Sequence, residues 1–152
     1  MQRIVALVAA MVLVLVGAGP AQAERDDGID WGVANWAAGV QMATSWPSVS
    51  DPYLHLRFKR VGGEGQRQVR MGERHKVEGT RTWGRYRFTE PVKLRVGEKV
   101  VLTTERPVAC EPPKAPLGIV AQMRIKPPGK PWSGWETWIS EDHILPDCTG
   151  TQ

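Results

Sequence analysis

The sequence predicts an all-β protein, a single-domain antiparallel β-sandwich or small barrel of about seven to nine strands with one C-terminal disulfide. The first observation is that apolar side chains recur at alternate positions between residues 53 and 104, with turn residues at short intervals. This period of two is typical of half-buried antiparallel strands. The second is that residues 117–126 repeat the alternation. The third is length, because 152 residues without a 23-residue leader leave 129, enough for one two-layer core.

Residues 1–23 are predicted to be a cleaved signal peptide. Arg3 supplies a short positive region, residues 4–16 form an apolar run, and Ala21-Gln22-Ala23 is a small-x-small cleavage pattern. The run is shorter than the about 20 residues that span a bilayer. We expect the mature chain to begin at Glu24, residues 24–30 to be flexible, and the protein to be secreted or periplasmic.

The two cysteines, Cys110 and Cys148, are predicted to form a disulfide. Export into an oxidising compartment makes this the expected state of a cysteine pair. The bond would close a loop of 148 − 110 = 38 residues, and the chain-entropy model assigns such a loop about 4 kcal/mol.

Residues 31–46 fit two descriptions. Val33, Trp36 and Val40 fall on one helical face, but Gly32 and Gly39 each weaken a helix by about 1 kcal/mol relative to alanine. We predict extended structure there, because the chain downstream follows the strand pattern. Pro47 and Pro52 then precede the main strand block.

Three turns are predicted inside that block. The glycine-rich residues 62–65 are expected to form a hairpin loop, and residues 72–74 a second turn. Gly97-Glu98 is expected to be a two-residue type II′ hairpin that joins strands at residues 92–96 and 99–104. Seven prolines at residues 107–131 then limit that stretch to one strand, residues 117–126, between two stiff loops.

Charge is unevenly distributed along the chain. Residues 24–56 contain one Arg against five acids, a balance of −4. Residues 57–106 contain fourteen Lys and Arg against six acids, a balance of +8, and residues 107–152 four against five, or −1. An asymmetry of this size indicates anionic partners rather than a particular fold.

The predicted binding residues begin with Trp83, Arg85 and Arg87. If residues 82–88 form a strand with Tyr86 and Phe88 directed inward, these three side chains share the outward face. A tryptophan beside arginines is a recognition pairing, because the ring stacks while the guanidinium holds an anion. A solvated face that protects the sheet is the alternative explanation.

Lys93 and Arg95 extend the predicted binding surface. They alternate with Leu94 and Val96, so they too are expected on the solvent side. If their strand lies next to that of Arg85 and Arg87, a spacing of about 5 Å between strands places all four charges within one Debye length.

Three further tryptophans, Trp132, Trp135 and Trp138, follow in the string Trp-Ser-Gly-Trp-Glu-Thr-Trp. Over these seven residues the string resembles the tryptophan motif of thrombospondin type 1 repeats, a family that the chain's two cysteines exclude. The string still predicts aromatic rings interleaved with guanidinium groups through cation–π stacking. In a strand, Trp132 and Trp138 share one face, a candidate carbohydrate platform, and Trp135 points the other way. At least one of the three is expected to pack in the core.

An enzyme is the alternative to a binding protein. His55, Glu73 and His75, together with arginines, can cleave RNA by general acid–base catalysis, which would make the chain a small secreted hydrolase of ribonuclease type. Serine hydrolase motifs are absent from the sequence. Four C-terminal residues could hold a metal, namely Glu141, Asp142, His143 and Asp147, but an acidic C-terminal loop is the preferred interpretation.

We therefore expect an exported binding protein without catalysis, cofactor or metal. Its cationic, aromatic-dotted sheet face would engage an anionic polysaccharide, a wall polymer or an acidic protein surface, with nucleic acid as a further polyanion. A proline-stiffened loop at residues 107–116 that inhibits another protein belongs to the same class, because preorganisation lowers the cost of binding.

Overall fold

The computed structural model describes residue 31 and residues 35–77, 79–108 and 116–144. This part of the chain contains nine strands and no helix, which confirms the all-β prediction. The strands are β1 (Asn35–Ala37), β2 (Val40–Ser45), β3 (His55–Arg60), β4 (Gln66–His75), β5 (Arg87–Phe88), β6 (Val92–Leu94), β7 (Lys99–Thr103), β8 (Leu117–Lys126) and β9 (Glu136–Ile144).

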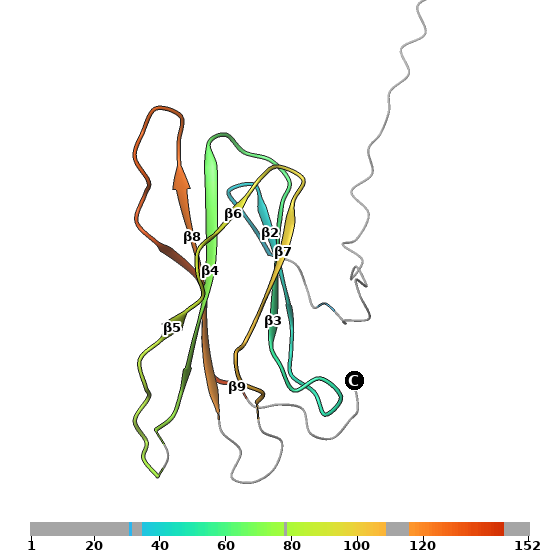
Figure 1. Cartoon of the computed structure of the whole chain (residues 1–152), viewed down its shortest axis with the longest axis vertical. Coiled ribbons are helices and arrows are strands. Elements are labelled where there is room, and N and C mark those ends of the chain that lie inside the picture. The colour runs from blue at the N-terminus through green and yellow to red at the C-terminus, as the bar shows by residue number, and fades with distance from the viewer. Residues whose placement is uncertain (1–30, 32–34, 78, 109–115, 145–152) are drawn as a thin grey trace, which may run out of the picture.

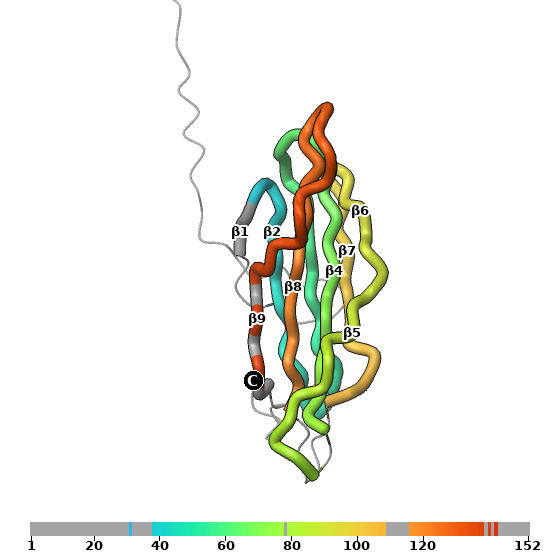
Figure 2. The backbone as a smooth tube through the Cα atoms, turned by 90° about the vertical axis from the view of Figure 1, so that its left-hand side faces the viewer, coloured from blue at the N-terminus to red at the C-terminus, as the bar shows by residue number. Residues whose placement is uncertain are grey.

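The strands form two antiparallel sheets. One has four strands in the order β1-β2-β3-β7. The other has five, in the order β5-β4-β8-β9, with β6 also paired to β4. Figure 1 shows β4 and β8 on one side of the molecule and β2, β3 and β7 on the other, and Figure 2 gives the view at right angles. The described strands stay in two separate sheets and close no barrel.

A single hydrophobic core lies between the two sheets. Leu56 and Phe58 of β3 contribute to it from the four-stranded sheet, and Val69 and Met71 of β4 from the five-stranded sheet. All four are buried and occupy the alternate positions that the sequence predicts. Trp138 of β9 packs against the same core, its ring centroid 6.4 Å from that of Phe58.

The extended structure predicted for residues 31–46 is confirmed where it is described, and the helical alternative is wrong. β1 and β2 form a hairpin whose two turn residues, Ala38 and Gly39, have φ of 45° and 76°. A two-residue hairpin turn with both φ positive is type I′. Gly39 also lies against the backbone of Gly62, where a Cβ would be 2.4 Å from the Gly62 oxygen.

The loop at residues 62–65 is not a hairpin, contrary to the sequence prediction. β3 and β4 on either side of it belong to different sheets, so the loop crosses from one sheet to the other. The reason lies in its two flanking arginines, Arg60 and Arg67, which are buried and donate hydrogen bonds to carbonyls of this loop. These bonds fix the loop over the end of the interior.

The turn predicted at residues 72–74 is also wrong, because these residues lie inside the ten-residue β4. Gly72 is required there by close packing rather than by a turn. A Cβ at this position would lie 2.7 Å from both Phe88 Cε1 and Val120 Cγ1. The missing side chain leaves room for the Phe88 ring.

The turn near Gly97 exists, but its type and its partners differ from the prediction. The Glu98 N–H donates to the Arg95 carbonyl at 3.0 Å, and Gly97, the third residue of this turn, has φ of 87°. Glycine at that position is typical of a type II turn, not II′. The strands it joins are β6 and β7, which lie in different sheets. Val96 is therefore exposed at the turn instead of facing the core.

Several predictions fall outside the described residues. They are the leader at 1–23, the flexible residues 24–30, the disulfide between Cys110 and Cys148, and most of the loop at 107–116. The strand predicted at residues 117–126 is confirmed with the same limits as β8. Among the described residues, no helix has the length and hydropathy needed to cross a membrane.

Candidate binding site

A row of alternating cations and aromatic rings covers the outer face of the five-stranded sheet. We call it the cation–π ladder. Arg124 lies over the rings of Trp132 and Trp135, with its Cζ 4.9 and 4.7 Å from their centroids. Arg70 follows, 4.1 Å from the Trp135 centroid and 4.0 Å from that of Phe88. A cation within about 6 Å of a ring centroid is attracted by the ring quadrupole.

The ladder continues toward the end of β4. The Tyr86 and Phe88 centroids are 6.1 Å apart, and Arg74 lies 4.5 Å from the Tyr86 centroid and 5.0 Å from that of Trp83. Lys76 completes the row, 5.5 Å from the Trp83 centroid. Arg124 lies opposite Gln68 in the register, so the ladder extends from the level of residue 68 to residue 76. Eight residues of strand correspond to about 27 Å.

The local fold explains why two tryptophans share this face. Trp132 and Trp135 precede β9 and are not part of a strand, so the strand alternation predicted for them is wrong. Ser133 folds their segment back along β8: its N–H donates to the Ile125 carbonyl at 2.7 Å, and its Oγ accepts from the Ile125 N–H at 2.9 Å. Both rings therefore lie over Arg124.

Two ladder arginines have neutral hydrogen-bond partners. Arg70 Nε donates to Gln122 Oε1 at 2.9 Å, and Arg124 Nε donates to Gln68 Oε1 at 2.7 Å. Partial burial, and then the nearby Arg124, lowers the pKa of Arg70. Because an arginine stays protonated in proteins, these side chains keep a positive charge that no carboxylate among the described residues cancels.

Arg74 is the ladder arginine that has an acidic partner. Its Nε donates to Asp142 Oδ1 at 3.1 Å, and its Nη2 donates to Asp142 Oδ2. The hydrogen bond to Asp142 raises the pKa of Arg74. Gly118 makes room for this pair, because a Cβ there would lie 2.5 Å from Asp142 Oδ1.

A pocket of about 290 Å³ opens where the ladder ends, and we call it the arginine pocket. Arg85, Arg87 and Arg106 line it, all exposed and without a carboxylate partner among the described residues. The remaining lining residues are Glu73, Arg74, His75 and Gly84. Arg74 lines the pocket and also belongs to the ladder, so the two features adjoin at this residue.

Glu73 and His75 lie side by side at the base of this pocket. Glu73 is 5% exposed, and its Oε2 accepts from the Glu105 N–H at 2.9 Å. His75 Nε2 lies 3.6 Å from Glu73 Oε1, beyond hydrogen-bond distance. This nitrogen is buried and has no hydrogen-bond partner among the described residues. The Glu–His–Arg grouping expected for hydrolysis is therefore present in part.

His55 is not in this group. It lies on β3 in the other sheet, where its Nδ1 is 2.9 Å from Thr103 Oγ1 and its Nε2 is 2.8 Å from Asp51 Oδ2. The three residues of the enzyme hypothesis therefore separate into the Glu73–His75 pair and a remote histidine. In the described part of the chain, no group of three or more His, Cys, Asp or Glu side chains is placed to hold a metal ion.

Comparison with models of known protein families, with curated proteins and with solved structures finds nothing that matches this chain. The site must therefore be interpreted from its own chemistry.

The faces of β5 are the reverse of those predicted. Arg87 lies opposite Glu73 and Phe88 opposite Gly72 in the register. Residues directly opposite each other share a face of the sheet, so Arg87 is on the side of Glu73, and Phe88, 40% exposed, lies over Arg70 on the outer face. The cause is Gly72, which offers the ring a flat backbone surface.

Lys93 is exposed on β6, as predicted, but not beside the β5 arginines. β5 and β6 pair with the same side of β4, one after the other, with Arg87 opposite Glu73 and Lys93 opposite Gln68. Five residues of β4 separate the two levels, which is about 17 Å. The four charges therefore do not lie within one Debye length of about 8 Å, and the prediction that they form one cluster is wrong.

The sequence interpretation also missed part of the site. Arg70, Arg74 and Arg124 were not among the predicted binding residues, although they form the ladder. Their positions alternate with buried Val69, Met71 and Met123, and that period assigns them to the face opposite the core. Trp138, predicted to bind, packs against the core instead.

Proposed function

We propose that this protein is a single-domain β-sandwich that binds an anionic polymer without catalysis, along the cation–π ladder and in the arginine pocket. One observation carries the proposal: an excess of positive charge in two adjoining features, the ladder and the arginine pocket. Four ladder cations and three pocket arginines make seven positive charges, against the carboxylates of Asp142 and Glu73 among the described residues. Such a field attracts polyanions.

The shape of the surface supports an elongated ligand. The ladder follows the strand direction over about 27 Å, and the pocket at its end accommodates one projecting anionic group. An acidic protein surface is the alternative partner, but a narrow straight row of charges fits a linear chain better than a broad interface does.

The rings indicate a polysaccharide or wall polymer rather than a nucleic acid. Proteins that hold single-stranded nucleic acids stack bases on free aromatic faces. Here a cation already lies over Trp132, Trp135, Phe88, Tyr86 and Trp83. The rings therefore serve to orient the cations, which then contact the anionic groups of the polymer.

The arginine pocket gives the direct test. Replacing Arg85 and Arg87 with Gln removes two exposed charges that have no acidic partner among the described residues. Log affinity for a polyanion falls linearly with log salt, with about 0.7 units of slope per contact for single strands. We expect the double variant to lose affinity for heparin and polyphosphate, and to lose about 1.4 units of slope if single-stranded RNA is the probe. Tryptophan fluorescence titration over a salt series measures both.

Lys59 and Lys99 provide a matched control. They are directly opposite each other in the four-stranded sheet, so Lys59→Gln with Lys99→Gln removes the same charge from the other layer. This control should bind like the wild type. Equal losses in both double variants would mean that only net charge matters, and the proposal would fail.

A second candidate function rests on the Glu73–His75 pair. His75 Nε2 lies 3.6 Å from Glu73 Oε1, and both residues line the pocket that the three arginines line. In RNA cleavage, Glu73 would take the proton of a ribose 2′-hydroxyl as its oxygen attacks phosphorus. Protonated His75 would give a proton to the 5′-oxygen as that bond breaks, with the arginines holding the phosphoryl oxygens. The burial of Glu73 and its bond to the Glu105 N–H favour binding over this chemistry.

His75 separates the two functions. If the protein only binds, His75→Ala should leave polymer affinity within a few-fold of the wild type, and RNA incubated with the wild-type protein should keep its length. Shortening of the RNA that disappears in His75→Ala, with the fold intact by circular dichroism, would establish the hydrolase instead. His55→Ala serves as the control histidine.

We further propose that the chain is exported, begins at Glu24 and contains the Cys110–Cys148 disulfide. The apolar run at residues 4–16 and the Ala21–Ala23 cleavage pattern support export, and an oxidising compartment supports the bond. The intact mass of the secreted protein should match residues 24–152 less two hydrogens. A mass that retains residues 1–23 would refute export, and a mass of two free thiols would refute the disulfide.

A further inference from the structure

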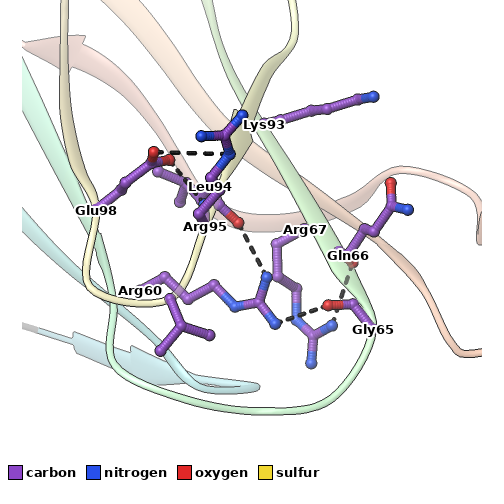
Figure 3. A pocket seen from close by; sticks show the side chains of 9 residues that line it. Arg60, Gly65, Gln66, Arg67, Lys93, Leu94, Arg95 and Glu98 are labelled. Carbon is purple, nitrogen blue, oxygen red and sulfur yellow. Dashed lines mark hydrogen bonds and ion pairs between the residues drawn. The ribbon is translucent and has the colours of Figure 1, made fainter.

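A second cationic pocket lies at the other end of the interior. On the inner face of β4, Arg67 and Glu73 are six residues apart, about 20 Å along the strand, and Arg67 marks the end away from the arginine pocket. We call the second site the end pocket; its volume is about 720 Å³ (Figure 3). Its lining residues are Arg60, Gly65, Gln66, Arg67, Lys93, Leu94, Arg95, Val96 and Glu98.

Arg60 is buried in this end of the molecule at 5% exposure. Its Nη1 donates to the Leu94 carbonyl at 2.9 Å, and its Nη2 donates to the carbonyls of Gly63 and Gly65, both at 2.7 Å. Every one of these acceptors is a neutral backbone oxygen. Arg60 thus fixes the loop between the sheets, and no carboxylate in the described part of the chain pairs with it.

Arg67, 6% exposed, has the same kind of environment. Its Nε donates to the Ala38 carbonyl at 3.2 Å and its Nη1 to the Glu64 carbonyl at 2.6 Å. Its Nη2 has no hydrogen-bond acceptor among the described residues. Burial, and then the charge of Arg60, lowers the pKa of Arg67.

The carboxylate in the end pocket does not pair with either buried guanidinium. Glu98 Oε2 accepts from the Arg95 N–H at 2.8 Å, and its Oε1 lies 3.9 Å from Arg95 Nε. Figure 3 shows Glu98 and Arg95 together on one side, the guanidinium groups of Arg60 and Arg67 next to each other, and Lys93 directed away from them. The lining therefore contains four cations against one carboxylate.

We propose that the end pocket binds a phosphoryl group, or another compact multivalent oxyanion, with Arg67 Nη2 as a direct donor and Arg60 and Arg95 supplying further positive charge. Fixing the loop explains the bonds to carbonyls, but a neutral donor would do the same without placing two like charges together. An oxyanion removes that cost. The planar fork of a guanidinium matches phosphoryl oxygens, and a multivalent anion offsets more than one of the four cations.

Inorganic pyrophosphate is the probe, added to the full chain at low ionic strength in a calorimetric titration. Arg60 and Arg67 support the fold, so the variants change exposed neighbours instead. We expect Arg95→Gln to weaken pyrophosphate binding about fivefold. Glu98→Gln, which keeps an acceptor for the Arg95 N–H, should strengthen it about fivefold, because single charge changes near a site shift binding by about 1 kcal/mol.

Arg81→Gln, an exposed charge outside both pockets, is the matched control and should bind as the wild type does. Malonate, a dicarboxylate, should bind more weakly than pyrophosphate. The proposal fails if Arg95→Gln and Glu98→Gln bind pyrophosphate with equal affinity. It also fails if malonate binds as tightly as pyrophosphate. It fails too if pyrophosphate binding is lost only in the double variant Arg85→Gln with Arg87→Gln. If long-chain polyphosphate displaces pyrophosphate, the end pocket accepts a phosphoryl group that is part of a polymer. If it does not, the end pocket accepts the phosphoryl group of a small free anion.

Discussion

Replacing Phe58 with Ala should lower the free energy of unfolding by about 3–5 kcal/mol, the usual cost of a fully buried aromatic side chain. Phe58 has no exposed surface and is the largest fully buried side chain among the described residues. It extends from β3 in one sheet toward Trp138 of β9 in the other, with 6.4 Å between ring centroids. The variant therefore removes a contact that joins the two sheets. Urea denaturation measures the loss.

Two further substitutions make that result specific. Phe58→Leu keeps most of the apolar volume and should cost less than about 1.5 kcal/mol. Val101→Ala changes an exposed residue of β7 and should cost less than about 0.5 kcal/mol. If Phe58→Ala cost no more than Val101→Ala, the two sheets would not share a core at this position.

Replacing Trp135 with Ala should have the largest effect on the cation–π ladder. The ring interacts with both Arg70 and Arg124, at 4.1 and 4.7 Å. Two cation–π contacts at about 0.5–1 kcal/mol each, together with lost packing, predict a fall of about 2 kcal/mol in the free energy of unfolding. Because both arginines lose the ring that orients them, affinity for anionic polymers should fall as well. Chemical denaturation and a heparin titration give the two quantities.

The matched controls for this prediction are Trp135→Phe and Trp46→Ala. Phenylalanine keeps a ring between the arginines and should restore most of both losses. Trp46 is 42% exposed and has no ring or cation contact among the described residues, so its removal should leave polymer affinity unchanged. A Trp135→Ala variant that binds heparin as the wild type does would show that the ladder only stabilises the sheet.

The strands themselves were predictable where a regular period lasts. Leu56 and Phe58, Val69 and Met71, and the whole of β8 are where the alternation of apolar residues places them. Alternation reports which face a side chain occupies, and burial on one face enforces it. It does not report which strands pair.

Pairing is what the sequence interpretation lacked. Whether β5 lies beside β6 or in line with it depends on contacts with β4, which is distant in sequence. The positions of Arg87 and Lys93 relative to each other could therefore not be predicted from the sequence. Glycine misled for a related reason. Gly72 sits inside a strand because the side chains of Phe88 and Val120 pack closely against it, a packing requirement that resembles a turn when only the neighbours in sequence are considered.

The tryptophan string gave the right chemistry and the wrong geometry. Rings interleaved with guanidinium groups were expected and are present, but the alternation rule was applied to a segment that precedes its strand. Ser133, which holds that segment against Ile125, makes its bonds outside any regular ladder. No periodic pattern in the sequence predicts such a hydrogen bond.

The in-line arrangement of β5 and β6 also bears on self-assembly. A long exposed strand edge offers unpaired N–H and C=O groups to which another chain can add a strand. On this side of β4 the gap between the two short strands is closed by Thr89, whose N–H donates to the Met71 carbonyl at 2.8 Å and whose hydroxyl accepts from the Met71 N–H at 3.1 Å. Pro91 follows and has no N–H to offer. This edge of β4 is therefore occupied by its own chain, which leaves short strands in place of one long edge for another copy to extend.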